Sequence, residues 1–252
     1  MVEGANLKKN KKKKSMITFY PKSYLRIKIF KKKISVFKKR NLAFNFFEKF
    51  SQNSFEKSNN FVDHLILRNK YSNLISNKTL LSVFRRHFVD SLTIELFFNS
   101  FHPKKKFLLC LDIGTGGGFP GLLLSFFFPT CFFLLIESIK KKIIFHQKIS
   151  NFLLLSNCKP LCSRAEIIGK SQKHRGNYDL IIARGVSELH SLIWFSFPLL
   201  ISGGRIVVLK QIFKISEEIS GAKTYFQTNK GKVKAVFPIS SSKKGRMVIL
   251  LK

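Results

Sequence analysis

An apolar run that ends in a glycine-rich loop constrains the fold of this chain more than any other feature. Residues Phe107 to Ile113 are apolar apart from Asp112, and the sequence Gly-Thr-Gly-Gly-Gly-Phe-Pro-Gly follows at 114–121. Such a run is typical of a strand buried on both faces of a parallel sheet. Glycines let a backbone approach a ligand closely because no Cβ stands in the way. The segment therefore predicts a buried parallel strand followed by a ligand-binding loop.

Strand and helix patterns alternate after this loop. A helix is expected over Phe119 to Phe128, ended near Pro129, and a long helix from Ser138. Runs that predict further strands are Cys131 to Ile136, Asp179 to Ala183, Gly204 to Leu209, Val233 to Phe237 and Met247 to Leu251. The last two indicate a terminal hairpin. Repeated strand–helix units predict a doubly wound α/β sheet whose ligand lies at the carboxyl ends of the strands.

The N-terminal part of the chain differs in composition from the rest. Residues 1–40 are rich in Lys and Arg with Glu3 as the single acid, and we expect a basic arm that is disordered until it meets a polyanion. From 41 to about 103, apolar residues recur at helical spacing, for example Phe61, Leu65 and Ile66. The expected organisation is an arm at 1–40, a helical region at 41–103 and an α/β domain at 104–252.

The charge of the chain indicates a polyanionic partner. Lys and Arg number 46 against 13 acidic residues, which gives a formal net charge of +33. Such a charge attracts nucleic acid or a ribosomal particle at long range, and a membrane surface is the second choice. The apolar stretch from Leu122 to Ile136 is too short to span a bilayer and contains Pro129. We expect a cytoplasmic location, with a plastid or other organelle as the alternative because of the basic arm.

The four cysteines give little indication of a metal site. Only Cys158 and Cys162 are close in sequence, and no second pair or nearby histidine accompanies them. We interpret all four as reduced thiols and expect no bound metal.

The glycine spacing alone fits several ligands, including dinucleotides, mononucleotides and S-adenosylmethionine. A Walker phosphate loop is excluded because the Gly-Lys-Ser/Thr ending is missing. Asp112 can reach the amino group of adenosylmethionine, directly or through water, and Glu137 can accept hydrogen bonds from both ribose hydroxyls. The alternatives are a helix N-cap for Asp112 and an exposed cap of a lysine-rich helix for Glu137. A nicotinamide site is disfavoured because Asp112 would crowd a pyrophosphate and no Tyr-x-x-x-Lys is present in the α/β region at 104–252.

Several spaced motifs resemble one family, the RsmG (GidB) small-subunit rRNA guanine-N7 methyltransferases. The motifs are Leu111 to Gly121, Leu-Ile-Glu-Ser at 135–138, Arg164-Ala165-Glu166, Ala183-Arg184-Gly185, Leu209-Lys210-Gln211, Asn73-Leu74-Ile75 and Arg86 to Ser91. The resemblance covers residue 60 to the C-terminus. It departs from the family pattern at Gly185, Gln211 and Ile75, where the family has Ala, Gly and Thr.

The resemblance implies a fold, a ligand and a partner. The fold is a Rossmann-like methyltransferase with a mostly parallel seven-stranded sheet and a C-terminal antiparallel hairpin. Its methyl donor is S-adenosylmethionine, its substrate is 16S rRNA or an assembling small subunit, and we expect a monomer. We expect eight residues to bind adenosylmethionine, some implied by the resemblance and some by their position at strand ends or in the glycine loop. They are Asp112, Gly114, Gly116, Phe119, Glu137, Ala165, Glu166 and Arg184.

Four residues are candidates for contact with the substrate RNA: His87, Arg164, Arg184 and Lys210. A salt bridge to Asp112 or Glu166 is the alternative for Arg184 and Lys210, and a structural hydrogen bond is the alternative for His87 with Asp90. No general base is expected, since guanine N7 carries a free lone pair and the main task is alignment of the reactants.

Two other functions remain compatible with the same residues. One is a methyltransferase of another macromolecular substrate. The other is a non-catalytic RNA- or ribosome-binding protein that retains the fold. Binding of rRNA without binding of adenosylmethionine would favour the second.

Overall fold

The computed structural model describes residues 50–76, 87–94, 108–211, 215–228, 231, 233–238 and 246–251 of the chain. The chain divides into two compact units, Met1–Lys49 and Phe50–Lys252, and all described residues belong to the second. The predicted basic arm at 1–40 therefore lies outside the described residues. The division into a helical region and an α/β domain stays a prediction.

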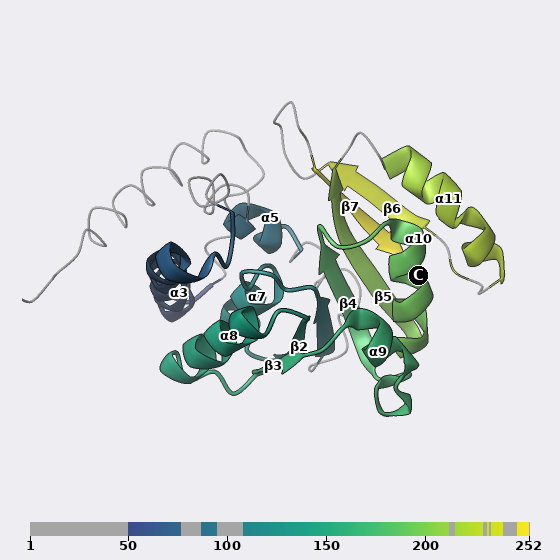
Figure 1. Ribbon diagram of the computed structural model, residues 1–252. Coiled ribbons are helices and arrows are strands. Elements are labelled where there is room, and N and C mark those ends of the chain that lie inside the picture. Colours follow the sequence, from purple (N-terminus) through teal and green to yellow (C-terminus); the bar gives the residue numbers. More distant parts are fainter. Residues whose placement is uncertain are drawn as a thin grey trace, which may run out of the picture. The chain divides into compact units, whose positions relative to one another are not determined.

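A single sheet forms the centre of the second unit (Figure 1). Its parallel strands are β1 (Leu108–Ile113), β2 (Cys131–Glu137), β3 (Cys158–Cys162), β4 (Tyr178–Arg184) and β5 (Leu200–Gln211). They lie in the order β3-β2-β1-β4-β5, so the chain reverses its direction of winding next to β1. Strands β7 (Arg246–Leu251) and β6 (Val233–Pro238) continue the sheet beyond β5, and both of these pairings are antiparallel. The predicted Rossmann-like parallel sheet is confirmed.

The strand on which the glycine loop depends lies in the middle of this sheet. In β1, Asp112 lies opposite Leu135 of β2 on one side and Ile182 of β4 on the other. Leu111 and Ile113 are buried together with Ile181, in the core between sheet and helices. This explains the continuous apolar run, because a central parallel strand is covered by helices on both faces.

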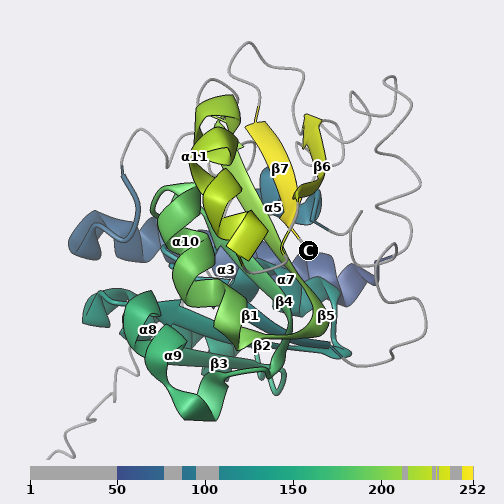
Figure 2. The same cartoon turned by 90° about the vertical axis from the view of Figure 1, so that its right-hand side faces the viewer.

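Two groups of helices cover the two faces of the sheet (Figures 1 and 2). One group is α3 (Gln52–Ser72), α5 (Val89–Leu92), α7 (Gly121–Phe127) and α8 (Lys140–Phe152). The other is α9 (Ala165–Lys170), α10 (Leu189–Ser196) and α11 (Ile215–Thr228), with short 3₁₀ turns at Gln172–His174 and Phe197–Leu199. Figure 2 shows this second group in front of the sheet. None of the helices in the described part of the chain is long and apolar enough to cross a membrane.

Helix α3 has clear signals at both ends. Ser51 caps its start, where its hydroxyl accepts a hydrogen bond from the backbone N–H of Ser54 at 3.2 Å. Asn73 ends it in the left-handed conformation, with φ of 42°. The side chain of Asn69 then accepts a hydrogen bond from the backbone N–H of Ile75 at 2.8 Å. These bonds direct residues 73–76 away from the helix and toward the glycine loop.

Strands β3 and β5 differ from the sequence-based expectations. No strand was predicted at 158–162, because Lys159 and Pro160 interrupt the apolar pattern; β3 is an edge strand, where proline is tolerated. Strand β5 begins at Leu200 rather than at Gly204, so the two glycines lie within it, beside an irregularity in its pairing with β4.

The first two helices of the α/β region begin later than predicted. Helix α7 starts at Gly121 rather than Phe119, after a cis Phe119–Pro120 peptide bond, and α8 starts at Lys140 rather than Ser138. In both cases the first residues of the predicted helix belong to the loop that follows a strand.

Candidate functional site

A cavity of about 480 Å³ lies beside the glycine loop, at the carboxyl ends of the central strands. The loop contributes Gly114 to Gly117 and Phe119, and β4 contributes Arg184. The other lining residues are Asn73, Leu74, Ile75, Ser76, His87, Ile139, Lys141 and Lys142. The volume lies within the range of about 300–1,000 Å³ that is typical of small-molecule sites. Parallel α/β sheets place ligands at this edge, next to the point where the strand order reverses.

The glycine loop is held by the end of the neighbouring strand. The backbone N–H groups of Gly114 and Thr115 both donate to the carbonyl oxygen of Ile136, at 2.9 and 3.1 Å. Gly114 has φ of +68°, which L side chains rarely adopt, and a Cβ there would lie 2.9 Å from Val186. A Cβ on Gly117 would lie 2.5 Å from Cγ2 of Ile75. These two glycines are therefore required by the packing of the loop as well as by access to a ligand.

Asp112 lies beneath the loop and is not among the described residues that line the cavity. Its side chain is fully buried, and Oδ2 accepts a hydrogen bond from the backbone N–H of Gly121 at 2.8 Å. Burial raises the pKa of this carboxyl group to about 6. The position matches the alternative of a cap at the start of α7. The predicted contact of Asp112 with a ligand, directly or through water, stays a prediction.

Glu137 joins the glycine loop to the start of α8. Its Oε2 accepts hydrogen bonds from Gly116 N–H at 3.1 Å and from the Lys142 ammonium group at 3.4 Å. Its Oε1 accepts from the backbone N–H of Ile139 at 3.1 Å and from the Ser138 hydroxyl at 3.4 Å. Only 7% of the residue is exposed, so the alternative of an exposed helix cap is not what the structure has. Three of these four partners line the cavity, so Glu137 lies immediately behind its wall.

Arg184 and His87 meet at the cavity although 97 positions separate them in sequence. The guanidinium Nη2 of Arg184 contacts Nδ1 of His87, and Nη1 donates to the His87 carbonyl oxygen at 3.5 Å. An arginine only donates, so Nδ1 of the imidazole is the acceptor in this contact. The His87 ring in turn packs on Phe119, with ring centroids 5.2 Å apart. Three predicted site residues are thus brought together.

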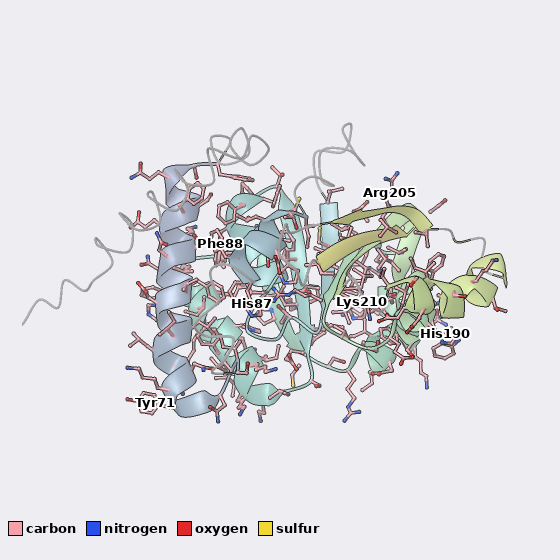
Figure 3. All side chains as sticks on the ribbon, turned by 90° about the horizontal axis from the view of Figure 1, so that it is seen from above. Tyr71, His87, Phe88, His190, Arg205 and Lys210 are labelled. Carbon is pink, nitrogen blue, oxygen red and sulfur yellow. The ribbon has the colours of Figure 1, made fainter. Side chains whose placement is uncertain are left out.

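Lys210 lies apart from this group, on the α11 side of the sheet (Figure 3). Its ammonium group is 2.7 Å from Glu218 Oε2 and donates to the Ser187 carbonyl oxygen, also at 2.7 Å. Only 9% of the residue is exposed, and it is not among the described residues that line the cavity. The predicted alternative was an ion pair with Asp112 or Glu166, but in the structure Lys210 forms its ion pair with Glu218.

Arg164, Ala165 and Glu166 lie where β3 leads into α9, at the same carboxyl edge of the sheet. Ser163, just before them, donates its backbone N–H to the Glu137 carbonyl oxygen at 3.1 Å. Arg164 and Glu166 are exposed, and none of the three lines the cavity. Their predicted roles toward adenosylmethionine and RNA stay predictions.

Some lining residues were not identified as ligand-binding candidates from the sequence. Thr115, Ile139 and Ser76 had no assigned role, and the sequence favours a phosphate contact and a solvated helix face equally for Lys141 and Lys142. For all of them except Ser76, closeness in sequence to Gly116 or Glu137 was the available signal. Within the described ranges, no cluster of three or more His, Cys, Asp or Glu side chains could hold a metal ion.

The residues around the cavity suit adenosylmethionine. The glycine backbone leaves room for close approach, and Gly116 has only the Gly114 carbonyl oxygen within 4 Å of where a Cβ would stand. The Glu137 carboxylate lies behind the wall at the place where ribose hydroxyls bind in sheets of this kind. Arg184, Lys141 and Lys142 provide cations for the carboxylate of a bound amino acid group.

Fold and family together define the class of the protein: it has a Rossmann-like methyltransferase fold. A crystal structure of a mutant of MtNAS in complex with S-adenosylmethionine superimposes with a TM-score of 0.51 at 14% identity, covering 74% of this chain and 71% of that one. Residues 54–247 match the family described as GidB, rRNA small subunit methyltransferase G, and the chain belongs to this family.

Curated relatives agree with this membership. The ribosomal RNA small subunit methyltransferase G of Bacillus licheniformis is 33% identical over 198 residues, which are 77% of this chain and 81% of that protein. The protein of the same name from Fusobacterium nucleatum is 31% identical over 202 residues, 79% of this chain and 83% of its own.

Proposed function

We propose that this protein transfers a methyl group from S-adenosylmethionine to N7 of a guanine in small-subunit rRNA. The observation that carries the proposal is the cavity beside the glycine loop, backed by Glu137 and reached by Arg184, in a chain of the rRNA small subunit methyltransferase G family. The positive charge of the chain supports an RNA substrate rather than a small molecule.

The residues around the cavity divide into two groups by what they can bind. We expect the loop backbone at Gly114 and Gly116 to approach the adenosine part of the donor, with Glu137 as acceptor for the ribose hydroxyls. Those hydroxyls would replace Lys142 and Ser138, whose bonds to Glu137 are the longest of its four. Lys142 would then be free to bind the carboxylate of the donor.

The reaction needs alignment more than acid–base chemistry. When bound, adenosylmethionine supplies the methyl group: the C–S bond breaks, its electron pair stays on sulfur, and a new bond forms to N7. Guanine N7 already carries a lone pair, so no residue has to remove a proton. We assign the aromatic pair of His87 and Phe119 to packing against the reacting guanine and excluding water, and Arg184 to holding the imidazole in place.

The proposal is tested by incubating the protein with labelled adenosylmethionine and small subunits from cells that lack this methylation. Label at N7 of one guanine supports the proposal, and label on protein alone overturns it. Binding of rRNA with no binding of adenosylmethionine would establish the non-catalytic alternative. A Gly114→Val chain is the negative control, because its new side chain would stand against Val186.

We also expect the enzyme to act as a monomer in the cytoplasm. Light scattering of the purified protein tests the first expectation, and fractionation of the cells that produce it tests the second. An organellar location would support the alternative suggested by the basic residues at 1–40.

A further inference from the structure

A second cavity, of about 370 Å³, lies between α3 and α8. We call it the α3–α8 groove, and its lining residues are His64, Arg68, Ser72, Lys141, Ile144, Phe145, Lys148, Ile149 and Phe152. Those on α3 follow one another at intervals of four residues and so share one face of the helix. Lys141 lines both this groove and the ligand cavity. The groove therefore begins beside the proposed methyl-transfer site.

The ends of the two helices show where the groove leads. Asn73, just after α3, and Lys141, in the first turn of α8, both line the ligand cavity. From Lys141 the groove continues along α8 to Phe152, the last residue of the helix. At about 1.5 Å per residue, this is a path of roughly 16 Å. A chain that places one group in the ligand cavity can continue along this path.

The groove combines exposed cations with an accessible aromatic ring. Arg68, Lys141 and Lys148 are all exposed, and none of the described residues that line the groove is acidic. Phe152 is 59% exposed, and its ring lies 4.6 Å from that of His64 between centroids. Proteins that bind single-stranded nucleic acid use this combination, with cations along the phosphates and aromatic rings under the bases.

We infer that the α3–α8 groove binds a single-stranded segment of RNA that adjoins the target base. The phosphates contact Arg68, Lys141 and Lys148, and one base stacks on Phe152. Charge decides between an RNA and an apolar protein segment, since three cations in a described lining that contains no acidic residue favour a polyanion. This inference rests on the proposed function, because that function places the target base in the ligand cavity. It assigns recognition of the adjoining RNA to a separate surface.

The test uses the full chain and a fluorescent single-stranded RNA oligonucleotide in a salt series. We expect Lys148→Glu to weaken RNA binding roughly tenfold and to lower the salt slope by about 0.7, as for the loss of one phosphate contact on a single strand. Phe152→Ala should also weaken binding roughly tenfold, and Phe152→Leu should not restore it, because the leucine keeps apolar volume without a ring face. The matched control is Lys223→Glu, the same charge change at an exposed position of α11.

Affinity for adenosylmethionine, measured by calorimetry, should be unchanged in all four variants and serves as the check on folding. The inference is overturned if Lys148→Glu and Phe152→Ala bind RNA as Lys223→Glu does. It is also overturned if a photo-crosslinker at Ile144 captures a ribosomal protein from small subunits instead of RNA.

Methyl transfer by the same variants separates this inference from the proposed function. We expect a higher KM for small subunits with kcat unchanged. If the unaltered protein methylates no RNA but loses RNA affinity in the groove variants, the proposed function fails and the groove assignment stands. If it methylates normally and the groove variants bind and react like the control, only the groove assignment fails.

Discussion

A single buried carboxylate supports the geometry of the glycine loop. Asp112 holds the first residue of α7 from below, where no water reaches it. Its pKa is raised by burial from 3.8 to about 6, so the folded protein favours the protonated form more strongly than the unfolded chain does. The stabilising contribution of this group is therefore complete below about pH 3.8 and is lost as the pH rises through about 6.

Asp112→Asn should remove this pH dependence, because the amide oxygen still accepts from Gly121 and nothing ionises. We compare the free energy of unfolding of the variant with that of the unaltered protein. The difference, variant minus unaltered protein, should rise by on the order of 3 kcal/mol between pH 4 and pH 7. Urea unfolding at a series of pH values measures the difference. A difference that is constant with pH would show that this carboxyl group titrates normally in the folded protein.

The contact of Gly117 with Ile75 links the loop to the end of α3. Gly117→Ala places a Cβ 2.5 Å from Cγ2 of Ile75, and we expect a loss of about 1–3 kcal/mol in stability with weaker binding of adenosylmethionine. Ile75→Ala in the same chain should recover part of both losses, since it removes the atom in conflict. Thermal unfolding and calorimetric binding of the single and double variants check this. Additive losses in the double variant would contradict a direct contact.

Among the secondary-structure elements, α11, β5 and α10 are connected by the carboxylate of Glu218. Glu218 of α11 pairs with Lys210 of β5 and accepts the backbone N–H of Leu189, the first residue of α10, at 2.9 Å. Lys210 also donates to the Ser187 carbonyl oxygen in the loop between β4 and α10. That loop carries Val186, which packs over Gly114. The ion pair therefore supports the wall of the ligand cavity from the opposite side of the sheet.

Glu218→Gln should keep the cap on α10 and leave the Lys210 ammonium group without its counter-charge. We expect a loss of about 2–4 kcal/mol in stability, because a largely buried cation then lacks its partner. Lys210→Met together with Glu218→Gln should recover part of the loss. Chemical denaturation measures these values, and RNA binding should stay within about twofold throughout. A large fall in RNA affinity for Lys210→Met would restore Lys210 as a substrate-binding residue.

At the scale of the whole molecule, the formal charge of +33 governs association with RNA. Affinity for RNA should fall steeply and linearly with salt on logarithmic axes, and each phosphate contact on a single strand contributes about 0.7 to the slope. Fluorescence anisotropy over about a sixfold range of salt concentration, from about 50 to about 300 mM, measures it. Affinity for adenosylmethionine should change little over the same range. A shallow slope for RNA would contradict the assignment of an RNA partner.

Local patterns in the sequence were sufficient for the order and type of the central elements. The apolar run before Gly114 and the alternation after it predict β1, α7, β2 and α8 because burial on a sheet and periodicity along a helix depend on neighbouring residues. Strand β3 could not be predicted in this way, because an edge strand that contains Pro160 has no continuous apolar run. The predicted order of strands and helices was also sufficient to place the ligand site at the carboxyl edge of the sheet.

The parallel sheet, the glycine loop and the family of the chain could all be inferred from the amino-acid sequence. The three-dimensional packing of the elements set the contacts of each polar side chain. It placed Asp112 under α7, brought Arg184 to His87, paired Lys210 with Glu218 and opened the α3–α8 groove. The physical reason is that periodicity is a local property, whereas a hydrogen bond between residues 97 positions apart depends on how the elements pack.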